Sequence, residues 1–232
     1  MKAFLLTAGL GTRLLPITQN TPKCLVEIGG KSLINWWFDA LENANVTEVL
    51  INLHHLPDKV RQHVSELNTN IKVTFFFEKK LFGSAGTLIA NADFVKGEDC
   101  FYIIYGDTLT NIDLKAMYNF HKHQGHPFTM ALFNTSNPKS CGIAKLNEKA
   151  TVIDFVEKPV SPKSNLANAG IYISHPSVLN LIDVNKSPAD IGFDLLPLLI
   201  NKMSGWETDN YLIDIGTHVN LQRAREEWPL LS

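Results

Sequence analysis

Residues 5–16 read Leu5-Leu6-Thr7-Ala8-Gly9-Leu10-Gly11-Thr12-Arg13-Leu14-Leu15-Pro16. The apolar residues from position 2 onward predict a buried strand that ends at Ala8 and is followed at once by a turn. Gly9 and Gly11 allow a tight turn with outward-facing backbone N–H groups, and Arg13 adds a planar set of donors that suits phosphate oxygens. Open α/β folds bind their ligands at this carboxyl end of a strand. The run therefore predicts an α/β fold with an anion site after its first strand.

A second cation follows ten residues later, where a stiff proline precedes a lysine in Pro22-Lys23. Two familiar phosphate motifs are excluded. A dinucleotide-binding G-x-G-x-x-G would need glycine where the chain has Leu14. A P-loop that ends in Gly30-Lys31-Ser32 would need glycine where the chain has Leu25. The missing dinucleotide pattern argues against a dehydrogenase.

The first 125 residues alternate short apolar runs with segments of helical spacing. The apolar runs predict buried strands over 2–7, 48–53, 72–77 and 100–105. The segments between and after them predict helices over 32–45, 57–67, 85–92 and 114–123. Such a β-α-β-α order predicts right-handed crossovers and a mostly parallel sheet with helices on both faces.

After Gly125 the alternation stops. Strand-like runs are joined there by loops too short for crossover helices, and they predict antiparallel or mixed additions to the same sheet, over 128–133, 142–146, 152–156 and 169–173. The remaining segments predict helices over 176–182 and 192–203, a strand over 206–213 and a closing helix over 217–228. No linker rich in Pro, Ser or Gly divides the chain. We therefore expect one domain over 1–232, with a nucleotide half up to about 125 and a second-substrate half over 126–232.

Composition restricts the class of protein further. The 232 residues include 21 Lys+Arg and 23 Asp+Glu, so the net charge of −2 argues against wholesale nucleic-acid binding. Cys24, Cys100 and Cys141 lie far apart, which suggests neither a disulfide framework nor a thiolate zinc site and favours a reducing compartment. No apolar run approaches the ~20 residues needed to cross a bilayer, and the first apolar run is shorter than a secretory core. We expect a cytoplasmic protein without a membrane partner.

The segment from Gly9 to Leu25 reads G-x-G-T-R-L-x-P-x-T-x-x-x-P-K-x-L and resembles the signature of the nucleoside-triphosphate sugar-1-phosphate nucleotidyltransferases. Four further landmarks match that family in its order: Gly106-Asp107, Phe155-Val156-Glu157-Lys158-Pro159, Asn168-Ala169-Gly170-Ile171-Tyr172 and Asp214-Ile215-Gly216-Thr217. Together they span nearly the whole chain. The resemblance implies a Rossmann-like three-layer α/β fold with a mixed, mostly parallel sheet, here without the C-terminal β-helix that many relatives carry.

The resemblance also implies roles for individual residues. Catalysis would depend on Arg13, Lys23 and Asp107. The nucleotide would be bound by Ala8, Gly9, Gly11, Thr12, Gly83 and Gly86. The sugar phosphate would be bound by Gly142, Glu157, Lys158 and Asn168. The family holds Mg²⁺ on two carboxylates that correspond to Asp107 and Asp214. Without the resemblance, Asp107 could equally cap a turn, and Glu157-Lys158 would be a solvated strand end.

The loop Gly83-Ser84-Ala85-Gly86 resembles that of guanylyltransferases that use mannose 1-phosphate or a heptose 1-phosphate. The partners implied are GTP and such a sugar 1-phosphate, and the product would be a GDP-sugar for cell-surface polysaccharide. A uridylyl- or thymidylyltransferase acting on glucose-type or N-acetylmuramate 1-phosphate is an alternative, because Thr7-Ala8-Gly9 replaces the more usual Ala-Gly-Gly. We expect a monomer or homodimer.

Two functions of other classes remain to be weighed. A metal-dependent glycosyltransferase would commonly show Asp-x-Asp, and no two aspartates here lie two apart. A non-catalytic nucleotide-sugar-binding module would not need the charged set named above.

Three histidines lie close together in the sequence, as the ligands of a metal site often do. Residues two apart on a helix point in different directions, so we expect His121, His123 and His126 to lie on a solvated helix end. Asp209 is expected to be a surface charge.

Overall fold

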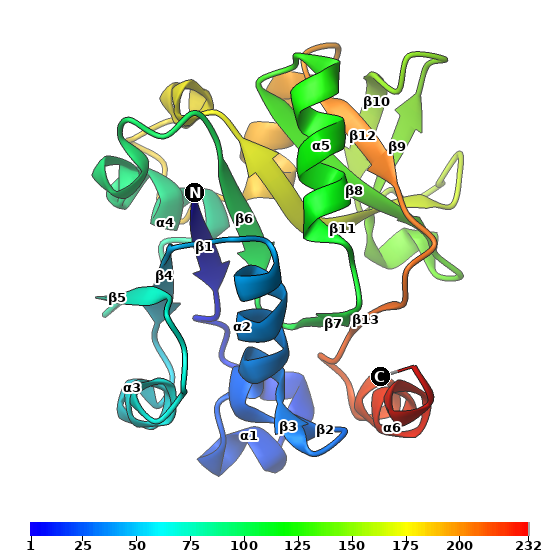
Figure 1. Ribbon diagram of the computed structural model, residues 1–232. Helices are drawn as coiled ribbons and strands as arrows, with labels where there is room; N and C mark the ends of the chain where they lie inside the picture. Colours follow the sequence, from blue (N-terminus) through cyan, green and yellow to red (C-terminus); the bar gives the residue numbers. More distant parts are fainter. Residues whose placement is uncertain (232) are drawn as a thin grey trace.

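A computed structural model describes residues 1–231 and shows a mixed central sheet with helices on both faces (Figure 1). In the first half of the chain the strands run parallel in the order β5–β4–β1–β6. Their bounds are β1 Lys2–Leu6, β4 Glu48–Leu53, β5 Lys72–Phe77 and β6 Phe101–Tyr105. The predicted fold class is confirmed. β5 departs from the prediction of full burial, because it is the edge strand and its side chains are half-buried or exposed.

Alternate residues of the central strands face opposite layers, as the two-residue period of a strand requires. On β1, Ala3 and Leu5 pack with helices α2, α3, α5 and α6, whereas Phe4 and Leu6 pack with α4 and the short turns near residues 176–199. Figure 1 shows α2 and α5 in front of the sheet and α4 behind it. The helices are α1 Ile17–Asn20, α2 Leu33–Asn43, α3 Pro57–Ser65, α4 Ser84–Ala90, α5 Leu114–Gln124 and α6 His218–Glu227.

The second half adds strands to the same sheet through β11. β11 runs antiparallel to β6, β8 and β9; β9 pairs antiparallel with β10, and β8 carries β12 in parallel. The bounds are β8 Phe128–Asn134, β9 Gly142–Leu146, β10 Val152–Glu157, β11 Leu166–Ser174 and β12 Ser204–Glu207. Both halves therefore share one sheet and its two apolar layers.

Two small ribbons lie outside the main sheet. One is a hairpin of β2 Glu27–Ile28 and β3 Lys31–Ser32. The other pairs β7 Thr108–Thr110 with β13 Leu212–Asp214 in antiparallel register, so that Asp214 lies opposite Thr108. This second ribbon brings the end of the chain beside the loop that follows β6.

The predicted strand over 206–213 is wrong, because the chain turns at Thr208 and enters two different sheets as β12 and β13. The Thr208 hydroxyl donates to Asn210 Oδ1 and accepts from the Asn210 N–H group, and Asn111 Oδ1 accepts from the Tyr211 N–H group. These side-chain bonds compete with a continuous strand.

The predicted helix over 192–203 is also wrong. It is a π-helical turn over Ile191–Leu195 followed by a 3-10 turn over Leu196–Leu199, because Pro197 cannot donate to a continuing helix. The segment 176–182 forms a 3-10 turn over Pro176–Leu181.

The expectation of a solvated end for α5 fails at His121. Its side chain is buried, and its Nδ1 lies 2.8 Å from Thr129 Oγ1 of β8, whereas His123 is exposed as expected. Burial lowers the pKa of His121 to about 4, and the nearby Lys122 and His175 contribute in the same direction. His121 is therefore a neutral packing residue.

No helix within residues 1–231 combines the length and apolar character that crossing a bilayer demands.

Candidate active site

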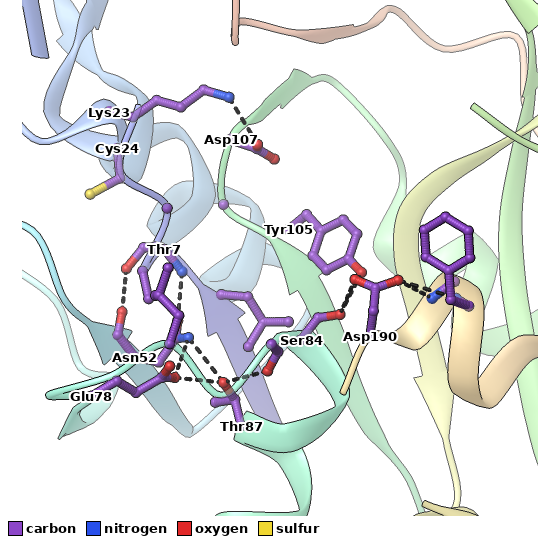
Figure 2. Close-up of a pocket in the computed structure, with 18 of the residues that line it drawn as sticks. Thr7, Lys23, Cys24, Asn52, Glu78, Ser84, Thr87, Tyr105, Asp107 and Asp190 are labelled. Atoms are coloured by element: carbon purple, nitrogen blue, oxygen red, sulfur yellow. Dashed lines mark hydrogen bonds and ion pairs between the residues drawn. The ribbon is translucent and has the colours of Figure 1, made fainter. Parts of the chain in front are cut away.

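A cavity of about 360 Å³ opens at the carboxyl ends of β1, β4 and β6 (Figure 2). It is lined from both halves of the chain. The sequence-predicted residues among its lining are Ala8, Gly9, Lys23, Gly83, Asp107, Glu157, Lys158 and Asn168. Position and lining therefore agree with a ligand site at the carboxyl edge of the sheet.

Two carboxylates and a lysine converge at one end of this cavity. Lys23 Nζ lies 2.8 Å from Asp107 Oδ2 and 2.9 Å from Asp214 Oδ1. Lys23 is nearly buried, at 9% exposure. Burial opposes its charge, but the attraction of Asp107 and Asp214 outweighs burial and holds the pKa of Lys23 above its usual value. Lys23 is therefore a fixed cation between two anions, and residues 107 positions apart in the sequence meet as the resemblance implies.

Gly216 leaves the space that this charged cluster needs. A Cβ atom there would lie 2.8–2.9 Å from Arg13 Nη2, Asp214 Oδ1 and Lys23 Nζ. The Gly216 N–H group also donates to Asp214 Oδ1 over 2.7 Å, which fixes that carboxylate. The Asp-Ile-Gly-Thr landmark thus supplies both a carboxylate and the room around it.

Arg13 stands beside the cluster rather than in the lining of the cavity. Its Nη2 lies 3.8 Å from Asp214 Oδ2, and its side chain is 67% exposed. The turn before it depends on Gly11, which has a positive φ of 65° and stands where a Cβ atom would lie 2.8 Å from Thr18 Cγ2. Gly9 and Thr12 are exposed in the same turn. Most of the Arg13 donors therefore remain available to an anion.

The loop over residues 82–86 is docked against the later segment 189–191. The Ala85 and Gly86 N–H groups both donate to the Ala189 carbonyl, at 3.0 and 3.2 Å, and the Ala189 N–H group donates to the Phe82 carbonyl. Gly83, with a φ of 78°, lies so close to Ala189 that no Cβ atom fits between them. Gly83 lines the cavity, whereas Gly86, which is not among the lining residues, forms part of this contact.

Sequence reasoning missed a buried polar network in the wall of the cavity, formed by Thr7, Asn52, Glu78 and Thr87. Asn52, Glu78 and Thr87 are each less than 5% exposed. Asn52 Nδ2 donates to Glu78 Oε1 over 2.8 Å, the Thr87 hydroxyl donates to the same oxygen over 2.6 Å, and the Thr7 N–H group donates to Asn52 Oδ1 over 2.7 Å (Figure 2). The network ties the ends of three strands together. The polar residue Asn52 within the otherwise apolar run of β4 was the feature of the sequence that could have indicated this network.

Glu157 also lines the cavity, and its carboxylate lies between two glycines. A Cβ atom on Gly142 or on Gly192 would come 2.5 Å from Glu157 Oε2, so both glycines make room for this carboxylate. Burial raises the pKa of Glu157; Lys158 opposes that shift and Asp190 adds to it. Gly142 thus shapes the cavity through Glu157 rather than by lining it.

Lys158 and Asn168 line the same cavity. Lys158 has a positive φ of 48°, a conformation that residues other than glycine adopt at a cost and that clusters at functional sites. Asn168 precedes the bulge in β11 where Gly170 has a φ of 72°. Its Oδ1 accepts from the Gly170 N–H group over 2.9 Å, and its Nδ2 donates to the Tyr172 hydroxyl over 2.7 Å. The side chain is therefore held in one orientation at the cavity wall.

The carboxylate pair suits a hard divalent cation. Asp107 and Asp214 already direct oxygens at one shared positive charge, the Lys23 ammonium. Mg²⁺ is bound through one or two carboxylates together with waters and substrate phosphates. Residues 1–231 contain no group of three or more His, Cys, Asp or Glu that could hold a metal without such help. The site therefore fits a cation that binds together with a phosphate substrate.

Solved structures share this fold. A putative glucose-1-phosphate thymidylyltransferase from Bacillus anthracis, solved in complex with a sucrose, matches with a TM-score of 0.88 and 28% identity over 99% of this chain and 95% of its own. HddC from Yersinia pseudotuberculosis, complexed with GMP-PN, matches with a TM-score of 0.80 and 24% identity over 98% and 99% of the two chains. The second likeness is evidence of fold alone.

Curated relatives match at the level of sequence. Mannose-1-phosphate guanyltransferases from Aspergillus oryzae and Schizosaccharomyces pombe are each 32% identical over 223 residues, which is 93% of this chain. The chain spans 61% of the length of each relative. The family model described as nucleotidyl transferase matches residues 2–228. A match over nearly the whole sequence, on a fold and charged cavity of the kind described above, places this chain in the nucleotidyl transferase family.

Proposed function

We propose that this chain transfers a nucleotidyl group from a nucleoside triphosphate to a sugar 1-phosphate and releases pyrophosphate. GTP and mannose 1-phosphate, or a heptose 1-phosphate, are the favoured substrates, and the guanyltransferase names of the two fungal relatives support that choice. The observation that carries the proposal is the meeting of Lys23, Asp107 and Asp214 at a cavity that is also lined by Glu157, Lys158 and Asn168.

The proposed reaction does not require a general base. A phosphate monoester has a second pKa of about 6, so the sugar phosphate is already an anionic nucleophile at neutral pH. One of its oxygens forms a bond to the α-phosphorus, the bond from that phosphorus to the bridging oxygen breaks, and pyrophosphate leaves with that electron pair. The barrier comes from repulsion between two anions and from charge that develops on the transferred group. Positioned cations lower both.

The cations of this chain can be assigned accordingly. Arg13, largely exposed beside Asp214, would hold the β- and γ-phosphates and the departing pyrophosphate. Lys23 would stabilise the charge that develops at the α-phosphate, and Lys158 would anchor the incoming phosphate. Asp107 and Asp214 would hold Mg²⁺, which when bound neutralises and orients phosphate oxygens. A cytoplasmic location is proposed with this function, and the three free thiols support it.

A thymidylyl- or uridylyltransferase that acts on a glucose-type sugar 1-phosphate is the second candidate. The likeness to the Bacillus anthracis structure, which is described as a putative glucose-1-phosphate thymidylyltransferase and covers almost the whole chain, favours it. The two candidates share the same charged cluster and differ only in base and sugar.

A substrate panel distinguishes them. GTP, UTP, dTTP and CTP are each combined with mannose, heptose, glucose and N-acetylated sugar 1-phosphates in the presence of Mg²⁺, and pyrophosphate release is measured. We expect the highest turnover with GTP and mannose or heptose 1-phosphate. Highest turnover with dTTP or UTP and a glucose-type sugar would select the second candidate. No release with any pair would contradict nucleotidyl transfer.

The role of the carboxylate pair is tested on the best pair of substrates. Asp107→Asn removes a charge that faces Lys23 and would face the metal, and we expect turnover to fall by at least about 10²-fold. Asp209→Asn is the matched control, because Asp209 is exposed and does not line the cavity. Near-normal turnover in Asp107→Asn would remove this residue from catalysis.

A further inference from the structure

Phe193 is an apolar side chain with no role in the chemistry described so far. The residue is 56% exposed, although phenylalanine is ordinarily buried in a core. It nevertheless lines the same cavity as Glu157, Lys158 and Asn168. Ligand cavities are commonly lined by aromatic side chains together with a few polar groups, so an exposed aromatic residue in this cavity is suited to contact a ligand.

The position of Phe193 is fixed by its backbone. It belongs to the π-helical turn over Ile191–Leu195, whose start is capped by Asp190. Asp190 Oδ1 accepts from the Gly192 and Phe193 N–H groups, at 2.8 and 3.2 Å. The other oxygen of Asp190 accepts from the Ser84 hydroxyl over 3.0 Å, and Figure 2 shows Asp190 beside Ser84 and Tyr105. The exposed ring therefore stands on a rigid turn.

The neighbours of the ring define what could lie on it. Lys158 Nζ lies over the Phe193 ring, 5.9 Å from its centroid, so an ammonium faces the apolar surface. Glu157, packed against Gly192 at the start of the same turn, offers carboxylate oxygens. Asn168 offers an amide at the same cavity wall. A ligand that matches these groups would carry an anionic group beside a ring of its own. The face of that ligand ring would be apolar, and hydroxyl groups would lie around its edge.

A pyranose 1-phosphate has this combination. The axial C–H groups of a pyranose form an apolar face, and its hydroxyl groups lie around the edge. In a sugar 1-phosphate, the phosphate is attached to C1. We propose, on the basis of the proposed function, that Phe193 is the platform on which the sugar ring of the incoming sugar 1-phosphate lies, and that it sets the preference for a pyranose. Lys158, whose ammonium lies above the ring, then meets the phosphate, while Glu157 and Asn168 meet hydroxyl groups.

The test compares Phe193→Ala with variants that keep part of the side chain. The sugar 1-phosphate and nucleotide with the highest turnover in the panel are used with the full chain. Because the apolar face of the sugar would lose its contact with the ring, we expect Phe193→Ala to raise the KM for the sugar 1-phosphate up to about tenfold. The KM for the nucleotide should stay within about twofold. Phe193→Tyr should recover most of the loss, and Phe193→Leu, which is apolar without a ring, should recover less. Phe77→Ala, at another exposed phenylalanine outside the cavity, is the matched control.

A second readout does not depend on turnover. Saturation-transfer NMR with mannose 1-phosphate should show transfer from aromatic protons to the C–H protons of the sugar, and Phe193→Ala should lose it. Unchanged sugar KM in both the Ala and Leu variants would overturn the platform while leaving nucleotidyl transfer intact. A raised nucleotide KM with an unchanged sugar KM would assign Phe193 to the base instead. Absence of turnover with every substrate pair would overturn the proposed function and the platform together.

Discussion

Lys158 combines a proposed role in binding with an unfavourable backbone conformation. Its φ of 48° lies in the left-handed region, where a Cβ atom crowds the backbone at a cost of roughly 1–2 kcal/mol. The Lys158 N–H group donates to the Cys141 carbonyl over 3.1 Å, which holds the conformation in place. Such strained residues cluster at functional sites, which supports the proposed role of the Lys158 side chain.

Two substitutions at this residue separate stability from binding. Lys158→Gly and Lys158→Ala both remove the ammonium, so both should raise the KM for the sugar 1-phosphate by about tenfold. The glycine variant should have the higher free energy of unfolding by about 1 kcal/mol, because glycine adopts this φ without strain. Urea denaturation and steady-state kinetics measure the two effects.

The control is Lys163→Ala. Lys163 is an exposed lysine that forms a long surface ion pair of 3.9 Å with Asp154. Equal unfolding free energies for the glycine and alanine variants would contradict the strain at Lys158.

At the level of residues, the charged groups of the site could be predicted from the sequence. The residues that hold the site in place through long-range hydrogen bonds could not. Arg13, Lys23, Asp107 and Asp214 stand in short motifs that resemble those of a known family, so they could be found without a structure. The supporting residues act through partners that only folding brings near. The bond from Ser84 to Asp190, for example, joins residues 106 positions apart. Roles in nucleotide and sugar-phosphate binding stay predictions for the substrate panel and its variants.

Among the elements, α5 is attached to the sheet by a buried histidine. His121 Nδ1 meets Thr129 Oγ1 of β8, and burial lowers the pKa of His121 to about 4 from an ordinary value of 6.5. Between these two values the unfolded chain binds a proton that the folded chain does not. Stability should therefore fall as the pH falls through this window.

We expect the free energy of unfolding to decrease by on the order of 1–2 kcal/mol from this group between pH 7 and pH 4.5. His121→Gln should remove that part of the pH dependence, whereas His123→Gln, at the exposed histidine of the same helix, should retain it. Denaturant unfolding at several pH values measures the slope. An identical slope in the His121 variant and the parent protein would show that this residue does not titrate on unfolding.

Elements with a clear hydrophobic pattern were predicted more successfully than elements whose ends are determined by side-chain hydrogen bonds. The strands β1, β4 and β6 are apolar runs in a parallel sheet, and they lie where their patterns place them. The break between β12 and β13 depends instead on bonds from Thr208 and Asn111, and Asn111 lies about a hundred residues away. No local pattern contains such a partner.

The molecule as a whole should unfold as one unit. β6 of the first half pairs with β11 of the second, with Ile104 opposite Ile171, and both strands contribute to the same two apolar layers. Separation of the halves would expose this shared core. We therefore expect the division near residue 125 to separate proposed binding roles and not folding units.

Tryptophan fluorescence tests this expectation. One variant keeps only Trp37, which is buried in α2, and another keeps only Trp206 in β12. Both should report the same urea midpoint, and far-UV circular dichroism should coincide with them. Two resolved midpoints would establish separate folding units.

The docking of residues 82–86 on residue 189 has a practical meaning for redesign. Because Gly83 leaves no space beside Ala189, and because three main-chain bonds join the two segments, neither can be reshaped alone. A graft that exchanges only residues 82–86 would introduce a backbone that does not fit against Ala189. The transferable module is the pair, and chimeras built from both pieces together are the ones that should retain the contact.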